Sequence, residues 1–191
     1  LRDASYPKVL VLEMAADRPG DIEFLVRIAS PKIGVLTAIG PAHLERFGTI
    51  ERVAAEKSLL MKALPADGTA VLNADDERVM AAAAKTKARV VSYGFREDAA
   101  VRAADTTPSF GQGPNGEPLV GVTVKVAADG AVVPVRLEGA LGRGHVSAAL
   151  AAAAVGHALG MNLVEIAEAL RAYQPPPGRM RALPGIKWTT L

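Results

Sequence analysis

Short runs of β-branched and other apolar residues alternate with longer amphipathic stretches through the first hundred residues. The apolar runs predict strands at residues 9–12, 33–39, 69–72 and 89–93. Apolar positions recur at helical spacing over residues 21–29, a helix that Pro31 closes, and over residues 49–64. This alternation is typical of βαβ units and predicts an α/β fold in which helices flank a mainly parallel sheet.

The pattern changes after about residue 101. Two apolar runs, residues 119–127 and 132–137, flank Asp129-Gly130, a dipeptide that favours the tight turn of a β-hairpin. The glycine- and proline-rich stretch 110–118 is predicted to be a mobile loop.

Two helices are predicted after the hairpin, over residues 145–159 and 163–172, and the second begins with the capping-box pair Asn162 and Glu165. The chain is therefore expected to form one α/β unit with successive parts. They are an α/β core at 1–100, a small β subdomain at 101–140, a helical segment at 141–175 and a final stretch at 176–191.

Composition narrows the class of protein. Half of the 191 residues are hydrophobic and only 4% are aromatic, which suits a globular α/β domain and excludes a disordered chain. The net charge of +2 is too balanced for nucleic-acid binding through the overall field. The absence of cysteine excludes a disulfide framework, a thiol nucleophile and cysteine-ligated zinc, so a cytoplasmic location is expected. No apolar run reaches the roughly 20 residues of a membrane span, so no membrane insertion is expected.

Two polar residues follow predicted strands. Glu13 comes directly after the run at 9–12, and His43 follows the strand at 33–39. Because the carboxyl ends of parallel strands meet at one edge of a sheet, the two side chains are expected to converge on a site for a hard cation. Each also has an ordinary alternative, a strand-end cap for Glu13 and a structural role for His43. Lys57, inside a predicted helix, is by itself typical of a solvated surface residue.

Several motifs occur in order along the chain. They are E-M-x-x-x-x-P-G-D-I from Glu13, A-H-L-E-x-F-G around His43, Lys57 after it, N-A-D-D from Asn73, a glycine-led alanine-rich helix at 141–154 and P-G-R-M at 177–180. The ordered set resembles the central ATPase domain of the Mur ligases, the ATP-dependent ligases of peptidoglycan precursor synthesis, and is most similar to the MurF branch, which adds D-alanyl-D-alanine.

The resemblance implies a P-loop NTPase-like fold and an ATP-dependent ligase that forms C–N bonds through an acyl phosphate. By similarity, Glu13 would bind the Mg²⁺ on the ATP phosphates, His43 would bind a second Mg²⁺, and a carbamylated Lys57 would support that second metal. Asn73, His145 and Arg179 become candidates for the nucleotide site. The implied substrates of the whole protein are a UDP-MurNAc-peptide and D-alanyl-D-alanine.

Each of the three nucleotide-site candidates also has a plainer interpretation. The stretch from Asn73 to Asp76 is first of all a turn, and His145 is first of all an N-terminal helix cap. Arg179 belongs to the basic stretch 171–191, which by its charge alone is typical of a solvated tail and which the resemblance makes a link near the nucleotide. His157 is interpreted as structural.

The sequence also departs from the family pattern. Ala38 stands where T-N-I-G has an amide, and Ala148 stands where an asparagine would contact adenine, so the affinity for the nucleotide or the preference for its base is in question. No Gly-Lys-Thr or Gly-Lys-Ser occurs in the sequence. The resemblance implies that this phosphate loop lies upstream of Leu1 and that N- and C-terminal domains flank the chain, so the chain alone is expected to be inactive and to bind ATP weakly.

Two alternatives to a MurF-like ligase remain open. The Glu56-Lys57 pair is also found in the related folylpolyglutamate synthases, although the motifs around Glu13 and His43 favour MurF. The substitutions at Ala38 and Ala148 favour a non-catalytic relative that keeps the scaffold as a binding or assembly module.

Overall fold

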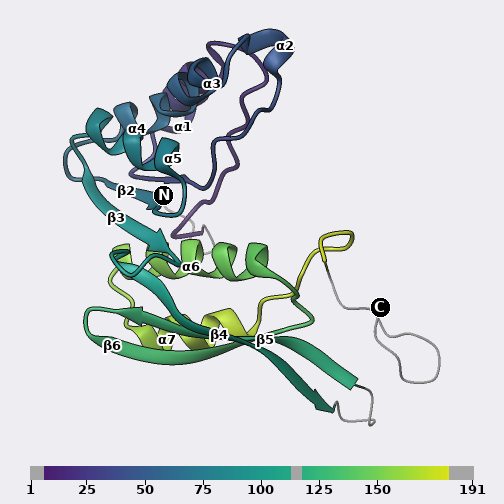
Figure 1. Ribbon diagram of the computed structural model, residues 1–191. Helices are drawn as coiled ribbons and strands as arrows, with labels where there is room; N and C mark the ends of the chain where they lie inside the picture. The colour runs from purple at the N-terminus through teal and green to yellow at the C-terminus, as the bar shows by residue number, and fades with distance from the viewer. Residues whose placement is uncertain (1–6, 113–117, 181–191) are drawn as a thin grey trace.

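The computed structural model describes residues 7–112 and 118–180. Its elements follow one another along the chain (Figure 1). The helices are α1 (Asp21–Ala29), α2 (Leu44–Phe47), α3 (Ile50–Lys57), α4 (Leu59–Ala63), α5 (Glu77–Ala81), the 3₁₀ helix η1 (Ala82–Lys85), α6 (Arg143–Ala158) and α7 (Leu163–Arg171). The strands are β1 (Ile33–Leu36), β2 (Thr69–Asn73), β3 (Arg89–Gly94), β4 (Val101–Gln112), β5 (Pro118–Ala128) and β6 (Ala131–Glu138).

The six strands form a single sheet in the order β1-β2-β3-β4-β5-β6. Strands β1, β2 and β3 are parallel and in continuous register. Strand β4 joins β3 in parallel through Tyr93↔Val101 and Gly94↔Arg102, and from β4 onward the pairing is antiparallel. The predicted α/β fold is confirmed, and the β subdomain is an extension of the same sheet.

Strand β2 is covered on both faces, which explains its continuous apolar run. Val71 belongs to a core formed with β3 to β6, α6 and α7, whereas Ala70 and Leu72 belong to a second core with α3, α4 and α5. Neighbouring residues of a strand point to opposite faces, so one short strand serves both cores. In Figure 1 the sheet bends around α6 and α7, and the helices α1, α3, α4 and α5 lie on its other side.

The predicted strand at 9–12 is wrong. No strand forms there, and the four side chains are exposed, with Val11 87% accessible. A strand needs a neighbour that accepts and donates its backbone hydrogen bonds, and in the described part of the chain β1 pairs only with β2. The predicted strand at 33–39 is shorter for a related reason, because β1 ends at Leu36, where its pairing with β2 ends at Leu72.

The predicted loop at 110–118 is partly wrong. Phe110, Gly111 and Gln112 continue β4, which pairs with β5 along its length, and residues 113–117 lie outside the described residues. Strand β4 was not predicted, since threonines and Pro108 interrupt its apolar pattern. Its long antiparallel pairing with β5 stabilises the strand although the local pattern is weak.

The helix predicted at 49–64 is divided at Ser58 into α3 and α4. The Ser58 hydroxyl donates to the Ala54 carbonyl at 2.6 Å, a local bond that competes with the regular helical pattern. The remaining local predictions are confirmed: Asp129 and Gly130 have φ angles of 49° and 77°, as a tight hairpin turn requires, and Asn162 and Glu165 form the capping box of α7.

Within the described ranges, 7–112 and 118–180, no helix is both long and apolar enough to cross a membrane.

Candidate functional site

The N-A-D-D motif at the end of β2 forms hydrogen bonds to the segments that follow β1 and β3. The Asn73 amide, at the end of β2, donates to the Thr37 carbonyl at 2.8 Å, just beyond β1. Asp75 accepts the backbone N–H groups of Phe95 and Arg96, just beyond β3. This turn therefore builds the carboxyl edge of the parallel strands.

Asp76 completes the same turn. One oxygen accepts the backbone N–H of Arg78 and of Val79 and so caps α5, while the other accepts the Ile39 N–H at 2.9 Å. The interpretation of residues 73–76 as a turn is supported by these bonds, and a nucleotide role for Asn73 stays a prediction.

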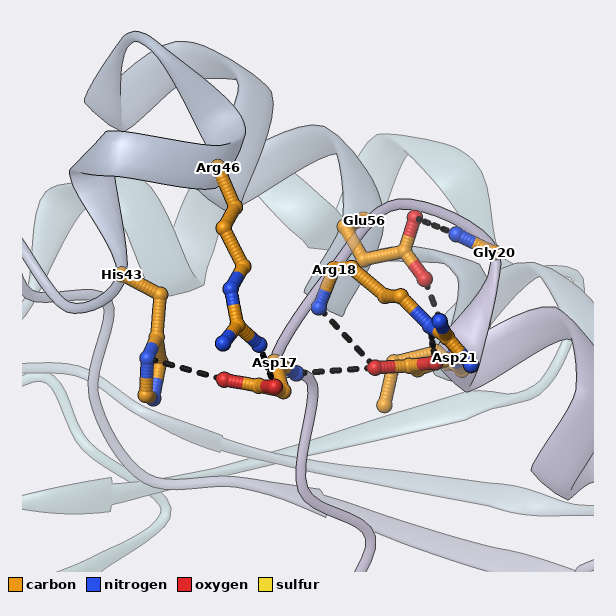
Figure 2. A network of polar contacts seen from close by, with 8 residues as sticks. Asp17, Arg18, Gly20, Asp21, His43, Arg46 and Glu56 are labelled. Carbon is orange, nitrogen blue, oxygen red and sulfur yellow. Dashed lines mark hydrogen bonds and ion pairs between the residues drawn. The ribbon is translucent and has the colours of Figure 1, made fainter.

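A second polar network lies at the N-terminus of α1, where loop 17–20 meets α2 and α3 (Figure 2). The Glu56 carboxylate on α3 is only 7% exposed and accepts the backbone N–H groups of Gly20 and Ile22, at 3.0 and 2.9 Å. It thereby satisfies donors that the first turn of α1 leaves open and places a negative charge at the positive end of that helix.

His43 lies at the N-terminal cap position of α2 with a left-handed backbone, φ 54°. Its ring is half exposed, and Nδ1 lies 3.0 Å from Asp17 Oδ1. Arg46, one turn along α2, pairs with the other oxygen of Asp17, and Figure 2 shows both side chains converging on that carboxylate.

The structure places Glu13 on the irregular segment before α1, with its side chain exposed. Lys57 is the last residue of α3, partly buried and adjacent to Glu56. Among the residues described, no group of three or more His, Cys, Asp or Glu side chains forms a ready metal site. A joint metal role for Glu13, His43 and Lys57 stays a prediction.

His145 has a different role from the predicted helix cap. Gly142 occupies the cap position of α6 and no side chain caps it. The buried His145 ring instead bonds through Nδ1 to the Tyr173 hydroxyl at 2.7 Å and through Nε2 to the Arg179 carbonyl at 2.6 Å. The cap prediction is wrong because the ring points toward the segment after α7, which offers it two partners.

The other candidates are simpler. The Arg179 side chain is exposed, and so are the two substituted positions, Ala38 and Ala148. His157 Nε2 lies 3.4 Å from Oδ2 of Asp129 in the hairpin turn, in agreement with a structural role.

Burial changes the acid–base behaviour of one residue at this edge of the sheet. Tyr93 on β3 is fully buried, and burial, followed by the negative charge of Asp75, raises the pKa of its hydroxyl to about 12. A hollow of 350 Å³ opens at the ends of β2 and β3. It is lined by Ala74, Glu77, Met80, Ser92, Arg96 and Asp98.

Sequence reasoning missed Asp17, Arg46 and Glu56 as members of one network. Asp17 and Arg46 occupy variable positions of the motifs, so the motifs gave no reason to single them out. In the sequence, Glu56 stands out only through its pairing with Lys57. A glutamate among the apolar positions of an amphipathic helix was the available signal, because a buried carboxylate needs partners.

Comparison with known proteins places these features in a family. The Mur ligase middle domain model matches residues 2–156. A UDP-N-acetylmuramoyl-tripeptide--D-alanyl-D-alanine ligase of Mycobacterium bovis is 40% identical over 182 residues, which are 95% of this chain and 34% of the relative. A UDP-N-acetylmuramate--L-alanine ligase of Xanthomonas axonopodis pv. citri is 39% identical over 146 residues, 75% of this chain and 28% of the relative.

Solved structures agree with the sequence relatives. MurF of Thermotoga maritima in complex with ADP has a TM-score of 0.74 at 28% identity over 94% of this chain and 39% of that one. MurF of Acinetobacter baumannii, at 24% identity, shares the fold with a TM-score of 0.74 over 90% of this chain and 36% of that one. The chain spans about a third of the length of the curated relatives it matches. The family match covers most of the sequence, and the chain therefore belongs to the Mur ligase family, in which it corresponds to the middle domain.

Proposed function

We propose that the protein carrying this chain is a MurF-type ligase, which uses ATP to join D-alanyl-D-alanine to a UDP-MurNAc-tripeptide in the cytoplasm. The observation that carries the proposal is the 40% identity, over 182 residues, to a ligase named for that reaction. The MurF structure solved with ADP supports the use of ATP.

The proposed chemistry has two steps. The terminal carboxylate of the tripeptide attacks the γ-phosphorus of ATP, and ADP leaves. The amine of the dipeptide then attacks the acyl carbon of the resulting acyl phosphate. The tetrahedral intermediate expels phosphate as the amine loses its proton, and an amide bond remains. Both steps develop negative charge on phosphoryl or acyl oxygens, so they need positive charge held in place.

The exposed side chains of Glu13 and His43 suit Mg²⁺ that arrives with the nucleotide. Magnesium commonly binds one or two protein carboxylates together with substrate phosphates and keeps several waters, so a closed cage of protein ligands is not needed. In this proposal Glu13 would hold the Mg²⁺ on the ATP phosphates and His43 would hold a second Mg²⁺. When bound, Mg²⁺ would supply the positive charge that the transferred phosphoryl group requires.

Lys57 has a separate proposed role. Addition of carbon dioxide to its Nζ forms an N–C bond and releases a proton, which replaces a cation by a carbamate anion. Such an anion on α3 would support the metal held by His43. The neighbouring Glu56 is already committed to Gly20 and Ile22 and does not serve this purpose.

An isotope experiment tests the acyl phosphate. We expect the full-length protein, given tripeptide substrate labelled with ¹⁸O in its terminal carboxylate, to release phosphate that contains one ¹⁸O atom per amide formed. Unlabelled phosphate accompanying normal product would contradict the proposed first step.

Substitution tests the metal role. Glu13→Gln and His43→Gln should each lower kcat by about 10²-fold or more, since both residues act on the charged transition state. The matched control is Glu97→Gln, an exposed carboxylate in the turn after β3, which should leave kcat unchanged. Full activity of the Glu13 and His43 variants would reject these roles while leaving the overall ligase proposal in place.

A further inference from the structure

We propose that Asp17 is a positioning residue for His43, holding its ring through Nδ1 so that Nε2 is presented to the metal. The inference deepens the proposed function and rests on it for the identity of what Nε2 binds. Asp17 occupies a variable position of the E-M-x-x-x-x-P-G-D-I motif, so the motif itself assigns it no role.

The first support is the contact between the two side chains. His43 Nδ1 lies 3.0 Å from Asp17 Oδ1, within hydrogen-bonding distance, whereas the other nearby carboxylate, Glu45, is 3.8 Å away. A neutral imidazole donates from one nitrogen and accepts at the other. Donation from Nδ1–H to Asp17 therefore leaves a lone pair on Nε2, the arrangement that metal-bound histidines commonly have.

The second support is that Asp17 is itself held in place. Its second oxygen pairs with Arg46, so both oxygens have partners on α2 or at its cap. The backbone N–H groups of Asp17 and Arg18 each donate to Asp21 Oδ2 at 2.9 Å. With its oxygens engaged and its charge balanced by Arg46, Asp17 is suited to orient His43 and poorly suited to compete as a metal ligand.

The third support is the fixed backbone of the two partners. The His43 carbonyl accepts the N–H groups of Arg46 and Phe47 at 2.9 and 3.0 Å, which anchors the residue at the start of α2. At the other end of loop 17–20, Glu56 holds Gly20 and Ile22. The network in Figure 2 thus joins the loop with Asp17, the cap with His43 and the helical turn that contains Lys57.

The tautomer of His43 provides a direct readout. The chain contains three histidines, so long-range ¹H–¹⁵N spectra at alkaline pH, where imidazole is neutral, can be assigned with single variants. We expect His43 to be protonated mainly on Nδ1. In Asp17→Ala the ratio should invert in favour of Nε2–H, and in the control Glu45→Ala it should stay unchanged. A ratio that does not change in Asp17→Ala, or a wild-type ring protonated mainly on Nε2, would overturn the proposal.

A folding control and a second variant complete the tautomer test. The His145 and His157 signals report whether the variant is folded, since both rings are held by distant elements. If Asp17→Ala disturbs them, Asp17→Asn serves instead; it keeps the size and removes the charge, so the share of Nδ1–H should fall. An unchanged share would count against the proposal.

A metal titration separates this inference from the proposed function. Because the metal is proposed to arrive with the nucleotide, Mn²⁺ is added together with ADP in place of Mg²⁺, and its binding is followed by the broadening of the His43 signals. Asp17→Ala should bind Mn²⁺ about 10–100-fold more weakly than the wild type, and Glu45→Ala should match the wild type. If Mn²⁺ never broadens His43, the metal role fails even when the tautomer inverts. If Mn²⁺ broadens His43 equally in wild type and Asp17→Ala, the positioning role fails and the metal role stands.

Discussion

Individual carboxylates near the candidate site divide into two kinds. Glu56, Asp75 and Asp76 accept backbone N–H groups and hold loops and strand ends in place. Glu13 is exposed and accepts no such backbone hydrogen bond in the described residues, and we propose that it binds a metal. The distinction matters because loss of the first kind costs stability, whereas loss of the second kind should cost activity alone.

Glu56 provides a stability prediction. Glu56→Ala leaves the N–H groups of Gly20 and Ile22 without their acceptor, so the free energy of unfolding should fall by about 1–3 kcal/mol, measured by urea denaturation. The control Glu168→Ala removes an exposed glutamate from α7 and should change it by less than about 0.5 kcal/mol. Equal effects of the two variants would show that Glu56 does not hold the loop.

Tyr93 provides a pH prediction. Because burial raises the pKa of its hydroxyl to about 12, the folded state resists ionisation that the unfolded state undergoes near pH 10. The stability that Tyr93 contributes is thus full below pH 10 and falls between about pH 10 and 12, by roughly 3 kcal/mol in all. Absorbance titration of wild type minus Tyr93→Phe should show phenolate forming near pH 12, and a midpoint near 10 would contradict the burial argument.

The candidate site was only partly predictable at the scale of residues. Motif order identified His43 and Glu13, but it could not reveal that Asp17 and Arg46 meet at the imidazole, because that contact joins residues far apart in the sequence at variable motif positions. For the same reason the partners of His145 were missed: Tyr173 and Arg179 reach it only after α6 and α7 have packed.

Among the elements, those with a strong local signal were predicted well. Strands β2 and β3, helix α1 and the β5–β6 hairpin agree with their apolar periods and turn residues. Strand β4 and the run at 9–12 show the limits of such signals in both directions. Strand β4 has a poor pattern but a long partner, and the run at 9–12 has a good pattern with no strand beside it in the described part of the chain.

The turn after β2 supplies a prediction for these elements. Asp76→Ala removes the cap of α5 and the acceptor of the Ile39 N–H, so the free energy of unfolding should fall by roughly 2 kcal/mol in urea denaturation. Asp67→Ala is the control, since Asp67 forms an exposed ion pair with Lys32 that contributes little. Asp76→Ala that unfolds at the same urea concentration as the control would refute the role assigned to this turn.

At the scale of the whole molecule, one bent sheet joins two cores. The core around β1, β2 and helices α3 to α5 carries the network of His43 and Asp17, while the core around β3 to β6 carries α6, α7 and the buried His145. The parallel half was predicted from sequence as the α/β core, and the antiparallel half was predicted as a small β subdomain within the same unit. Strands β3 and β4 are joined by only two residue pairs, and so short a ladder leaves no signal in the sequence.

The most direct test of the central proposal is the mass of the product that the full-length protein forms from ATP, a UDP-MurNAc-tripeptide and D-alanyl-D-alanine. A MurF-type ligase should add the whole dipeptide, with loss of one water and formation of one ADP per product. The account would be contradicted if these substrates gave no product and the protein instead converted ATP to ADP while joining L-alanine to UDP-MurNAc, or glutamate to a folate.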